Sequence, residues 1–338
     1  MFNFANLNKK INDEFGSLIA KNNACALVDF PDQPNVGDSA IWLGALKLLN
    51  ANNLQIDYAC TAETYSETTL RSKLPEGYIF IIGGGNFGTL WPRHQKLREK
   101  ILALQGNYTV IQLPQSIYFD DESSVKNIRV LIENHKNFTL MVRDTVSQQF
   151  ADNNFNCKVV LCPDLATLLS GDLPLGTATL DVQVLARDDI ERSVEANKLN
   201  HLLKKYLISV DDWLHEPLTP TLLAAKLMQQ SFQHGLDPVD VLGNGALSIW
   251  NAAARQRLAR GCQLLSQGQV VVTDRLHAHI ISSLMDIPNI ILDNHYGKLS
   301  AYYFTWHREL KSTMLASSVE DVVDCVDKLM PVNELVAW

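Results

Sequence analysis

Residues 270–299, VVVTDRLHAHIISSLMDIPNIILDNHYGKL, carry the pattern that decides the fold. The opening run, VVVT, is rich in β-branched residues, which predicts a buried strand. Leu276, Ile280 and Leu284 then recur at helical spacing, and the apolar run at 289–293 predicts a second strand. A strand, a helix and a strand in this order are typical of a parallel sheet in an α/β protein.

The same alternation continues along the chain in both directions. Runs with strand character lie at residues 24–30, 54–60, 77–84, 108–114, 138–144, 157–164, 181–187, 206–210, 238–243 and 269–274. Helical patterns lie near 4–15, 38–50, 94–105, 122–135, 144–153, 189–206, 219–234, 250–267 and 318–330. The segment at 170–180 contains two glycines and a proline without helical periodicity, so we interpret it as a linker.

This organisation predicts an α/β fold of two Rossmann-like domains with mainly parallel sheets, at residues 1–172 and 178–338. A length of 338 residues is more than one ordinary α/β sheet requires and suits two domains. Ligands bind at the carboxyl ends of the strands in open α/β sheets. We therefore expect the two sheets to face a central cleft.

Composition and charge restrict the class of function. Hydrophobic residues make up 46% of the chain and charged residues 20%, which is typical of a folded protein with a sizeable core. The net charge is −8 and the 29 basic residues form no block, so no nucleic-acid partner is expected. The N-terminus lacks the apolar core of a signal peptide and no apolar run could span a membrane, so we expect a cytoplasmic protein. The six cysteines are scattered, and we expect buried free thiols.

Arg275 and His277 lie where the strand at 269–274 gives way to a helix. Backbone N–H groups and the positive end of a helix make this position an anion site. An arginine adds a bidentate fork for carboxylate or phosphate, and a histidine can donate a proton at neutral pH. The alternative is structural, with Arg275 paired to Asp274 and His277 acting as a helix cap.

His277 and His279 form an H-x-H pair that could suggest a metal ion. Positions i and i+2 of a helix diverge by about 200°, so the two imidazoles could not share one ion. No carboxylate pair lies nearby in the sequence to complete a site. We therefore predict no metal, and His279 is expected to be packed and hydrogen-bonded.

A second candidate arginine, Arg143, ends the strand-like run FTLMVRD. Asp144 follows it and has the character of a helix N-cap, because Ser147 lies three residues later. Arg143 would then project from the carboxyl end of a strand. The alternative is that Arg143 only forms an ion pair with Asp144.

Two loops with glycine or asparagine complete the candidates. GGGNFG at 83–88 resembles a dinucleotide fingerprint, but Pro92 interrupts the helix that such a motif should open, and the next strand ends LPQS without an acidic residue. The glycines more simply allow a close approach of the backbone to a ligand. In the loop FPDQPNVGDSAIW, Asn35 and Asp38 lie at the expected cleft rim. Asp38 either caps a helix or hydrogen-bonds a sugar.

Several short motifs together resemble one enzyme family. N-x-G-D at 35–38, GGG-N at 83–86, LPQS at 113–116, RD-x-x-S at 143–147, PD at 163–164 and DRLH at 274–277 followed by Lys298 resemble the polysaccharide pyruvyl transferase family. The resemblance extends from about residue 25 to 300. It implies a GT-B-like arrangement of the two Rossmann-like domains and transfer of a pyruvyl group from phosphoenolpyruvate to a sugar hydroxyl pair.

The resemblance also implies roles for individual residues. It assigns catalysis to His277 and Arg275, donor binding to Arg143, Arg275 and Lys298, and acceptor binding to Asn35, Asp38, Asn86 and Gln115. The N-terminal domain would then form the acceptor side and also supply Arg143, and the C-terminal domain would form the donor side. The acceptor would be a bacterial exopolysaccharide or cell-surface glycan precursor, with a pyruvate ketal formed and phosphate released. Phosphoenolpyruvate is a co-substrate, and no cofactor is implied.

Two other functions remain as alternatives. A GT-B-like glycosyltransferase that uses a nucleotide sugar would share the architecture, but retaining members carry Glu-x7-Glu, and no Glu lies between Glu216 and Glu309. A non-catalytic glycan-binding protein would not need Arg143, Arg275 and His277 at strand ends. The sequence leaves open a lipid-linked acceptor, peripheral association with membrane-bound glycan machinery, and a homo-oligomer.

Overall fold

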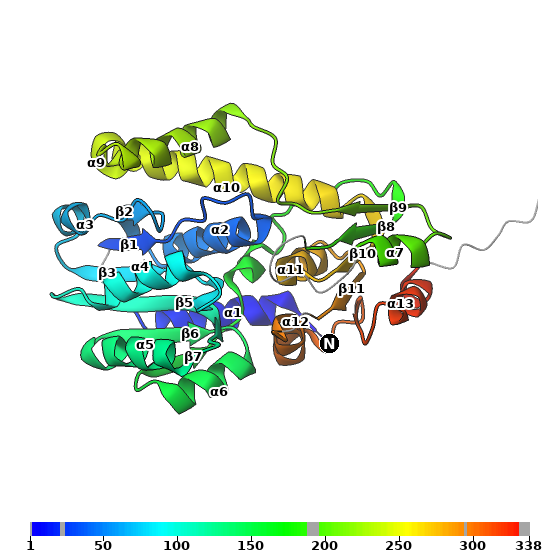
Figure 1. The fold of residues 1–338 in the computed structure, drawn as a ribbon, viewed down its shortest axis with the longest axis horizontal. Helices are drawn as coiled ribbons and strands as arrows, with labels where there is room; N and C mark the ends of the chain where they lie inside the picture. The colour runs from blue at the N-terminus through cyan, green and yellow to red at the C-terminus, as the bar shows by residue number, and fades with distance from the viewer. Residues whose placement is uncertain (1, 21–23, 188–195, 294–295, 331–338) are drawn as a thin grey trace, which may run out of the picture. The chain divides into compact units, whose positions relative to one another are not determined.

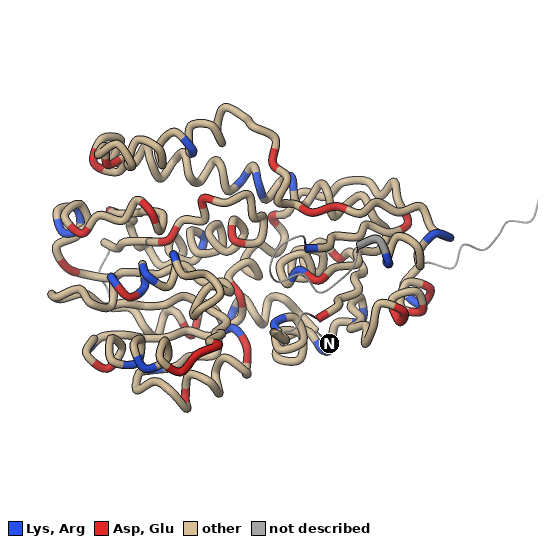
Figure 2. Tube along the Cα trace, in the orientation of Figure 1, with Lys and Arg blue, Asp and Glu red and all other residues tan. Residues whose placement is uncertain are grey.

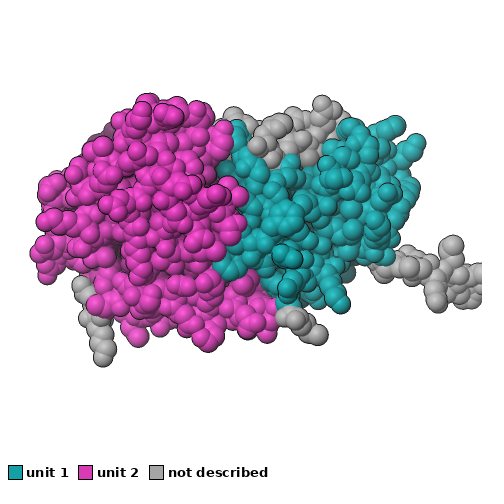
Figure 3. Space-filling model, turned by 90° about the horizontal axis from the view of Figure 1, so that it is seen from below, with its two compact units in different colours: residues 1–2, 170–215, 259–338 teal, residues 3–169, 216–258 magenta. Residues whose placement is uncertain are grey.

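The computed structural model describes residues 2–20, 24–187, 196–293 and 296–330. The chain forms two compact units, which Figure 3 shows in different colours. Unit 2 contains residues 3–169 and 216–258, and unit 1 contains residues 1–2, 170–215 and 259–338. Each unit is an α/β structure built on its own parallel sheet (Figure 1).

The sheet of unit 2 has seven strands in the order β2-β1-β3-β5-β6-β7, with β4 paired to β5 beyond this path. Its strands are β1 Ala24–Val28, β2 Gln55–Cys60, β3 Gly77–Ile81, β4 Gly84–Gly88, β5 Tyr108–Tyr118, β6 Phe138–Val142 and β7 Lys158–Leu161. All the strand pairs are parallel. The register between β5 and β6 shifts between Gln112 and Gln115, which is typical of a β-bulge near a functional site.

The helices of unit 2 follow the expected alternation. They are α1 Phe4–Gly16, α2 Val36–Ala51, α3 Glu67–Lys73, α4 Pro92–Leu102, α5 Glu122–Asn134, α6 Thr145–Asn154, the 3₁₀ helix η1 Leu165–Leu169, α8 Pro220–Gln233, α9 Pro238–Leu242 and the larger part of α10 Asn244–Leu265, whose residues from 259 onward belong to unit 1. Side chains at Asn35, Asp121 and Asp144 accept hydrogen bonds at the N-termini of α2, α5 and α6. Such caps satisfy backbone N–H groups that have no partner within the helix.

The glycines at 83–88 have a structural role between two strands. A Cβ atom at Gly83 would lie 2.2 Å from the Pro114 carbonyl oxygen, and one at Gly88 would lie 1.7 Å from the Tyr118 carbonyl oxygen. Only glycine allows β4 to approach β5 so closely. Gly84 sits differently, because its added Cβ would lie 3.8 Å from an oxygen of the Asp38 carboxylate.

Residues 216–258 pack with unit 2 although they follow the linker at 170–180. The reason is a buried aromatic cluster, in which the Phe30 ring lies 5.4 Å from the Trp250 ring and 4.9 Å from the Trp42 ring. Trp42 Nε1 also donates to Asn251 Oδ1 at 2.8 Å. Figure 1 shows α8 and α10 on the same side of this unit as α2. The expected second domain, 178–338, therefore contributes part of its length to unit 2.

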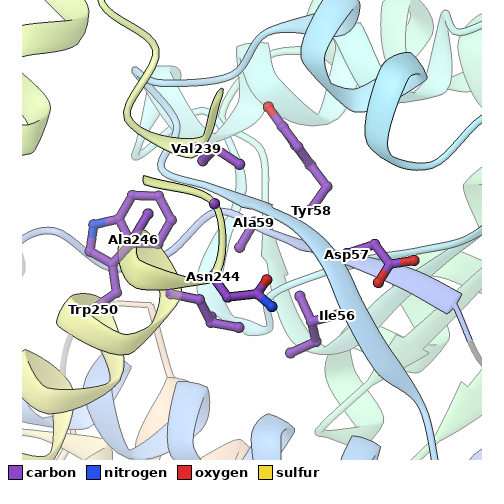
Figure 4. Close-up of a pocket in the computed structure, with 10 residues that line it drawn as sticks. Ile56, Asp57, Tyr58, Ala59, Val239, Asn244, Ala246 and Trp250 are labelled. Atoms are coloured by element: carbon purple, nitrogen blue, oxygen red, sulfur yellow. The ribbon is translucent and has the colours of Figure 1, made fainter. Parts of the chain in front are cut away.

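The prediction of a strand at 238–243 is wrong, because this segment forms helix α9. Asp237 caps it by accepting hydrogen bonds from the backbone of Val239 and Asp240, and Pro238 occupies the first helical turn. In Figure 4, α9, the start of α10 and β2 enclose a small pocket lined by residues that include Ile56, Tyr58 and Trp250. Its volume of about 10 Å³ holds at most one water molecule.

The sheet of unit 1 has five parallel strands in the order β12-β11-β10-β8-β9. Its elements are β8 Leu180–Leu185, α7 Ala196–Leu202, β9 Ile208–Asp211, β10 Gly268–Thr273, α11 Leu276–Leu284, β11 Asn289–Leu292, α12 Lys298–Tyr302, the π-helix η2 Tyr303–His307, β12 Thr313–Ala316 and α13 Asp321–Leu329. Valines and isoleucines of the central strands pack against α13, which contributes Val322 and Val326. Of the helix expected at 189–206, residues 189–195 lie outside the described ranges.

The α/β class and the mainly parallel sheets agree with the predicted Rossmann-like organisation. The GT-B-like arrangement and the central cleft stay predictions. Figure 2 shows Lys and Arg scattered among Asp and Glu in both units. In the described ranges, no helix is long and apolar enough to cross a membrane.

Candidate functional site

In unit 1, the candidate residues begin at the carboxyl end of β10. The Thr273 hydroxyl donates to the Leu185 carbonyl at 2.7 Å and accepts from the Arg275 N–H at 3.0 Å. Asp274 Oδ1 accepts from the Arg187 backbone N–H at 2.9 Å. These bonds join the ends of β8 and β10, and they fix the turn from which α11 starts.

Arg275 is the N-cap residue of α11 and is 2% exposed. Its Nη2 donates to Asp212 Oδ2 at 2.6 Å, and its guanidinium lies 5.7 Å from the centre of the Trp213 ring. Asp212 follows β9 directly, so the carboxylate that fixes Arg275 comes from the carboxyl end of another strand. Sequence reasoning considered only Asp274 as a partner and missed Asp212.

His277 lies in the first turn of α11, at the helix end where backbone N–H groups favour an anion. Lys298 begins α12 after the next strand of the chain, β11. The Asp293 carboxylate accepts from the backbone N–H groups of Leu299 and Ser300, each at 3.2 Å, which holds the start of α12 in place. The structure thus places His277 and Lys298 at two helix starts, and each follows a strand of the same sheet.

His279 faces a different environment, as its position two residues along the helix predicts. Its Nδ1 lies 2.7 Å from Asn289 Oδ1, and its Nε2 lies 2.9 Å from His307 Nδ1. Because a carbonyl oxygen can only accept, His279 donates through Nδ1 and accepts at Nε2. Burial lowers the pKa of His279 to about 4, so it is neutral at physiological pH. Within the described residues, no group of three His, Cys, Asp or Glu side chains is placed to hold a metal ion.

In unit 2, Arg143 follows β6 and is 2% exposed. Its Nη1 donates to Asp164 Oδ2 at 2.7 Å, and its Nε donates to the Ser116 hydroxyl at 2.8 Å. Asp144 caps α6 by accepting from the Ser147 N–H at 2.7 Å, and it accepts from Ser116 at 2.6 Å. Arg143 is therefore anchored by Asp164, which follows β7, whereas sequence reasoning had weighed Asp144 as its partner.

The four expected acceptor residues form two pairs in unit 2. Asn35 Nδ2 donates to Asp38 Oδ2 at 2.8 Å, and Asn35 also caps α2 by accepting from the Gly37 N–H at 3.0 Å. Gln115 Nε2 donates to Asn86 Oδ1 at 3.0 Å. Gly84 precedes Asn86 by two residues and approaches the Asp38 carboxylate, so the two pairs are near neighbours.

A network that sequence reasoning missed lies beside these pairs. His94 Nδ1 lies 2.8 and 2.9 Å from the two oxygens of the Asp29 carboxylate, and Asp29 has a left-handed backbone with φ of 75°. Non-glycine residues in this region are strained, and such strain gathers at functional sites. Arg93 donates to His94, Asp32 and Glu63. Burial and the neighbouring Glu63 carboxylate raise the pKa of Asp32 to about 6, although Arg93 opposes the shift.

The signals for this network were present but weak in the sequence. Asp29 directly follows an apolar strand, as Asp274 does, but it lacks an adjacent arginine that would mark it. Arg93 and His94 belong to a helix, and helical periodicity does not show which strand end a helix start meets. The long-range partners could only be found once the strand order was known.

Together the fold and these residues define an α/β protein with two groups of candidate residues. In unit 1, buried Arg275, His277 and Lys298 follow strands of the five-stranded sheet. In unit 2, buried Arg143 follows a strand of the seven-stranded sheet, which also carries amide and carboxylate side chains. The sequence profile of the polysaccharide pyruvyl transferase family matches residues 35–296. This range includes all the candidate residues except Lys298. The chain belongs to the polysaccharide pyruvyl transferase family.

Individual relatives agree with this family. Pyruvyl transferase 1 of Schizosaccharomyces pombe is 34% identical over 333 residues, which covers 93% of this chain and 75% of that protein. EpsO of Bacillus subtilis, whose name describes a pyruvyl transferase, is 28% identical over 88% of this chain and 90% of its own length. An uncharacterized protein of Klebsiella pneumoniae with a crystal structure has a TM-score of 0.58 at 18% identity, covering 93% of this chain and 99% of that chain, and it supports the fold alone.

Proposed function

We propose that this protein transfers the pyruvyl group of phosphoenolpyruvate to two hydroxyl groups on a sugar of a bacterial exopolysaccharide or cell-surface glycan precursor. The product is a cyclic pyruvate ketal, and inorganic phosphate is released. Membership of the family supports the transfer of a pyruvyl group. The observation that carries the choice of donor is the start of α11, where buried Arg275 and His277 follow β10 at a helix N-terminus.

Phosphoenolpyruvate has a carboxylate and a phosphate, which require two sets of cationic or N–H donors. We assign Arg143, Arg275 and Lys298 to these groups. Both arginines are anchored by aspartates, so their planar guanidinium groups are oriented before the donor binds. The N–H groups at the start of α11 add a fixed positive potential for one of the anions.

His277 supplies the proton in the proposed chemical step. The π electrons of the donor take this proton at the methylene carbon, which becomes a methyl group and leaves oxocarbenium character at C2. One sugar hydroxyl forms a bond to C2 and loses its proton. The second hydroxyl then forms its own bond to C2 and also loses its proton, while phosphate leaves with the electron pair of the C2–O bond, and the ketal closes. Of the two hydroxyl protons, one restores the protonated His277 and the other leaves with phosphate. The cationic groups stabilise the phosphate as its charge develops.

The acceptor side of the proposal is the group of Asn35, Asp38, Asn86 and Gln115 in unit 2. Carboxylate and amide oxygens accept hydrogen bonds from hydroxyl groups, and amide nitrogens donate to them. The Asp38 carboxylate would repel the anionic phosphoenolpyruvate, whereas it can accept a hydrogen bond from a hydroxyl group of a neutral sugar. This chemical difference supports the assignment of the group to the sugar.

The direct test is phosphate release from phosphoenolpyruvate in the presence of candidate sugar acceptors. The donor carries ¹³C in its pyruvyl carbons, and the product is analysed by mass spectrometry and NMR. We expect phosphate release that depends on an acceptor, and a labelled ketal carbon in the sugar. Transfer of a sugar from a nucleotide sugar, with no labelled ketal from phosphoenolpyruvate, would replace this proposal with a glycosyltransferase.

A further inference from the structure

Arg98 of α4 is fully buried in unit 2 and contacts Asn86, one of the proposed acceptor residues. Its guanidinium lies 4.3 Å from the centre of the Phe87 ring. Its donors reach Gln112 Oε1 at 2.7 Å, Gln95 Oε1 at 2.9 Å and Asn86 Oδ1 at 2.9 Å. An arginine has no acceptor, so each of these three amides must turn its oxygen towards Arg98.

The orientation of Asn86 fixes the orientation of Gln115 in turn. The Asn86 oxygen faces Arg98, so its NH₂ group points the other way, towards Asp29 Oδ2 at 3.5 Å. Gln115 also meets the Asn86 oxygen, so Gln115 must present its NH₂ group there, at 3.0 Å. The carbonyl oxygen of Gln115 is consequently directed away from Asn86.

Gln115 Oε1 is buried and has no hydrogen-bond partner among the described residues. Buried polar atoms are nearly always paired in folded proteins, and an exception requires an explanation. Gln115 pairs with Gly84 of β4, and its backbone carbonyl accepts from the Arg143 N–H at 3.1 Å. The unpaired oxygen therefore belongs to a residue that adjoins both the acceptor group and the proposed donor-binding Arg143.

We infer that Gln115 Oε1 accepts a hydrogen bond from a hydroxyl group of the acceptor sugar, and that Arg98 is the positioning residue that directs this oxygen. The identity of the ligand as a sugar rests on the proposed function. A carbonyl oxygen needs a donor, and the ionised carboxylate and phosphate of phosphoenolpyruvate offer only acceptors. A sugar hydroxyl carries an O–H donor and can therefore donate to Gln115 Oε1.

The test measures sugar binding without phosphoenolpyruvate. Methyl glycosides of glucose, galactose, mannose and N-acetylglucosamine, each with its singly deoxygenated analogues, are titrated by calorimetry and by saturation-transfer NMR. Removing the hydroxyl that contacts Gln115 should weaken binding by about tenfold in the wild-type protein. In Gln115→Met, which keeps the length of the side chain but has no carbonyl, the same removal should have little effect.

Gln183→Met is the matched control. Gln183 lies on β8 of unit 1, is fully buried, and also has an amide oxygen without a partner among the described residues. In this control, the affinities for the deoxygenated analogues should follow the same pattern as in the wild type. Arg98→Lys retains the charge but cannot donate to all three amides. In a sample of this variant that circular dichroism shows to be folded, removing the hydroxyl that contacts Gln115 should no longer weaken binding more than removing any other hydroxyl.

Three results would overturn the inference. They are no binding of any glycoside by the wild-type protein, equal losses for every deoxygenated analogue in wild type and Gln115→Met, or an unchanged pattern in Arg98→Lys. Phosphate release is measured separately. If a glycoside binds but no phosphate is released from phosphoenolpyruvate, the proposed function fails while the binding pattern still decides the role of Gln115.

Discussion

At the scale of single residues, the two candidate donor arginines share one design. Arg275 is anchored by Asp212 and Arg143 by Asp164, and each aspartate follows another strand of the same sheet: β7 is the neighbour of β6, and β9 is separated from β10 by β8. A buried cation without such a partner would be costly, and a flexible one would lose entropy when a ligand binds. The aspartates therefore hold the guanidinium groups in one orientation at the carboxyl ends of the sheets.

The planar shape of Arg275 leads to the first prediction. Arg275→Ala should weaken phosphoenolpyruvate binding by about 2–5 kcal/mol, measured by titration calorimetry, because the arginine is nearly fully buried. Arg275→Lys should also bind weakly, since an ammonium group cannot form the bidentate fork. Exposed Arg308 provides the control, and Arg308→Lys should bind the donor as the wild type does. Wild-type affinity in Arg275→Ala would remove this residue from the donor site.

His277 is the subject of the second prediction. His277→Gln can hydrogen-bond but cannot deliver a proton, so its turnover should fall by about 10² to 10⁴. Donor affinity should change little, because the arginines and Lys298 supply most of the binding. Exposed His234 gives the control variant His234→Gln, for which turnover should be unchanged. A turnover near that of the wild type in His277→Gln would assign the proton to another group.

At the scale of elements, the His279–His307 pair joins α11 to η2, and Asn289 adds the start of β11. Burial lowers the pKa of His279 from its ordinary value of 6.5 to about 4. Between these pH values the unfolded chain binds a proton that the folded chain does not. The contribution of neutral His279 to the free energy of unfolding is therefore fully present above about pH 6.5 and is lost as the pH falls towards 4.

The third prediction follows from the direction of this pH dependence. The free energy of unfolding should decrease as the pH is lowered from 6.5 to 4, with His279 contributing up to about 1.4 kcal/mol for each pH unit. Urea unfolding of the wild type and of His279→Gln at a series of pH values measures the difference. The variant should show the shallower pH dependence, although it is less stable at pH 7. Parallel curves for the two proteins would contradict a neutral, buried His279.

The helices and strands also show how much of the fold could be predicted from the sequence. Periodicity predicted the central strands and the helix after β10, because these segments have apolar patterns that match their burial. It failed at 238–243, where the Asp237–Pro238 helix cap decided the structure of a short apolar run. It gave no sign of β12, whose four residues are too few for a period.

In the candidate site too, the sequence predicted some residues and not others. Sequence patterns pointed to residues that adjoin strand ends, such as Arg143 and Arg275. They included Asp164 in a motif but could not identify it as the partner of Arg143, and they did not identify Asp212 or Arg98, because these contacts depend on the strand order and on where α4 packs. Contacts over long sequence separations are set by the topology, which a local pattern does not contain.

At the scale of the whole molecule, the return of residues 216–258 to unit 2 yields the fourth prediction. Trp250 is buried against Phe30, so Trp250→Ala should lower the free energy of unfolding by about 3–5 kcal/mol. Leu227 lies in the same segment and is 53% exposed, so Leu227→Ala should have a small effect. Urea unfolding followed by circular dichroism compares the two. Equal, small effects would mean that this segment does not stabilise unit 2.

The same connection sets the order in which the chain can fold during synthesis. Residues 3–169 leave the ribosome first, but their partner segment ends at 258. At about 5–20 residues per second, the roughly 90 residues in between take about 4 to 18 s to translate. Throughout that interval the apolar surface around Phe30 and Trp42 lacks its cover, so the nascent protein is exposed to aggregation and to chaperones. The sheet of unit 2 is thus made first, but it waits for its helical cover until residue 258 has been synthesised, and the strands of unit 1 are completed only after that.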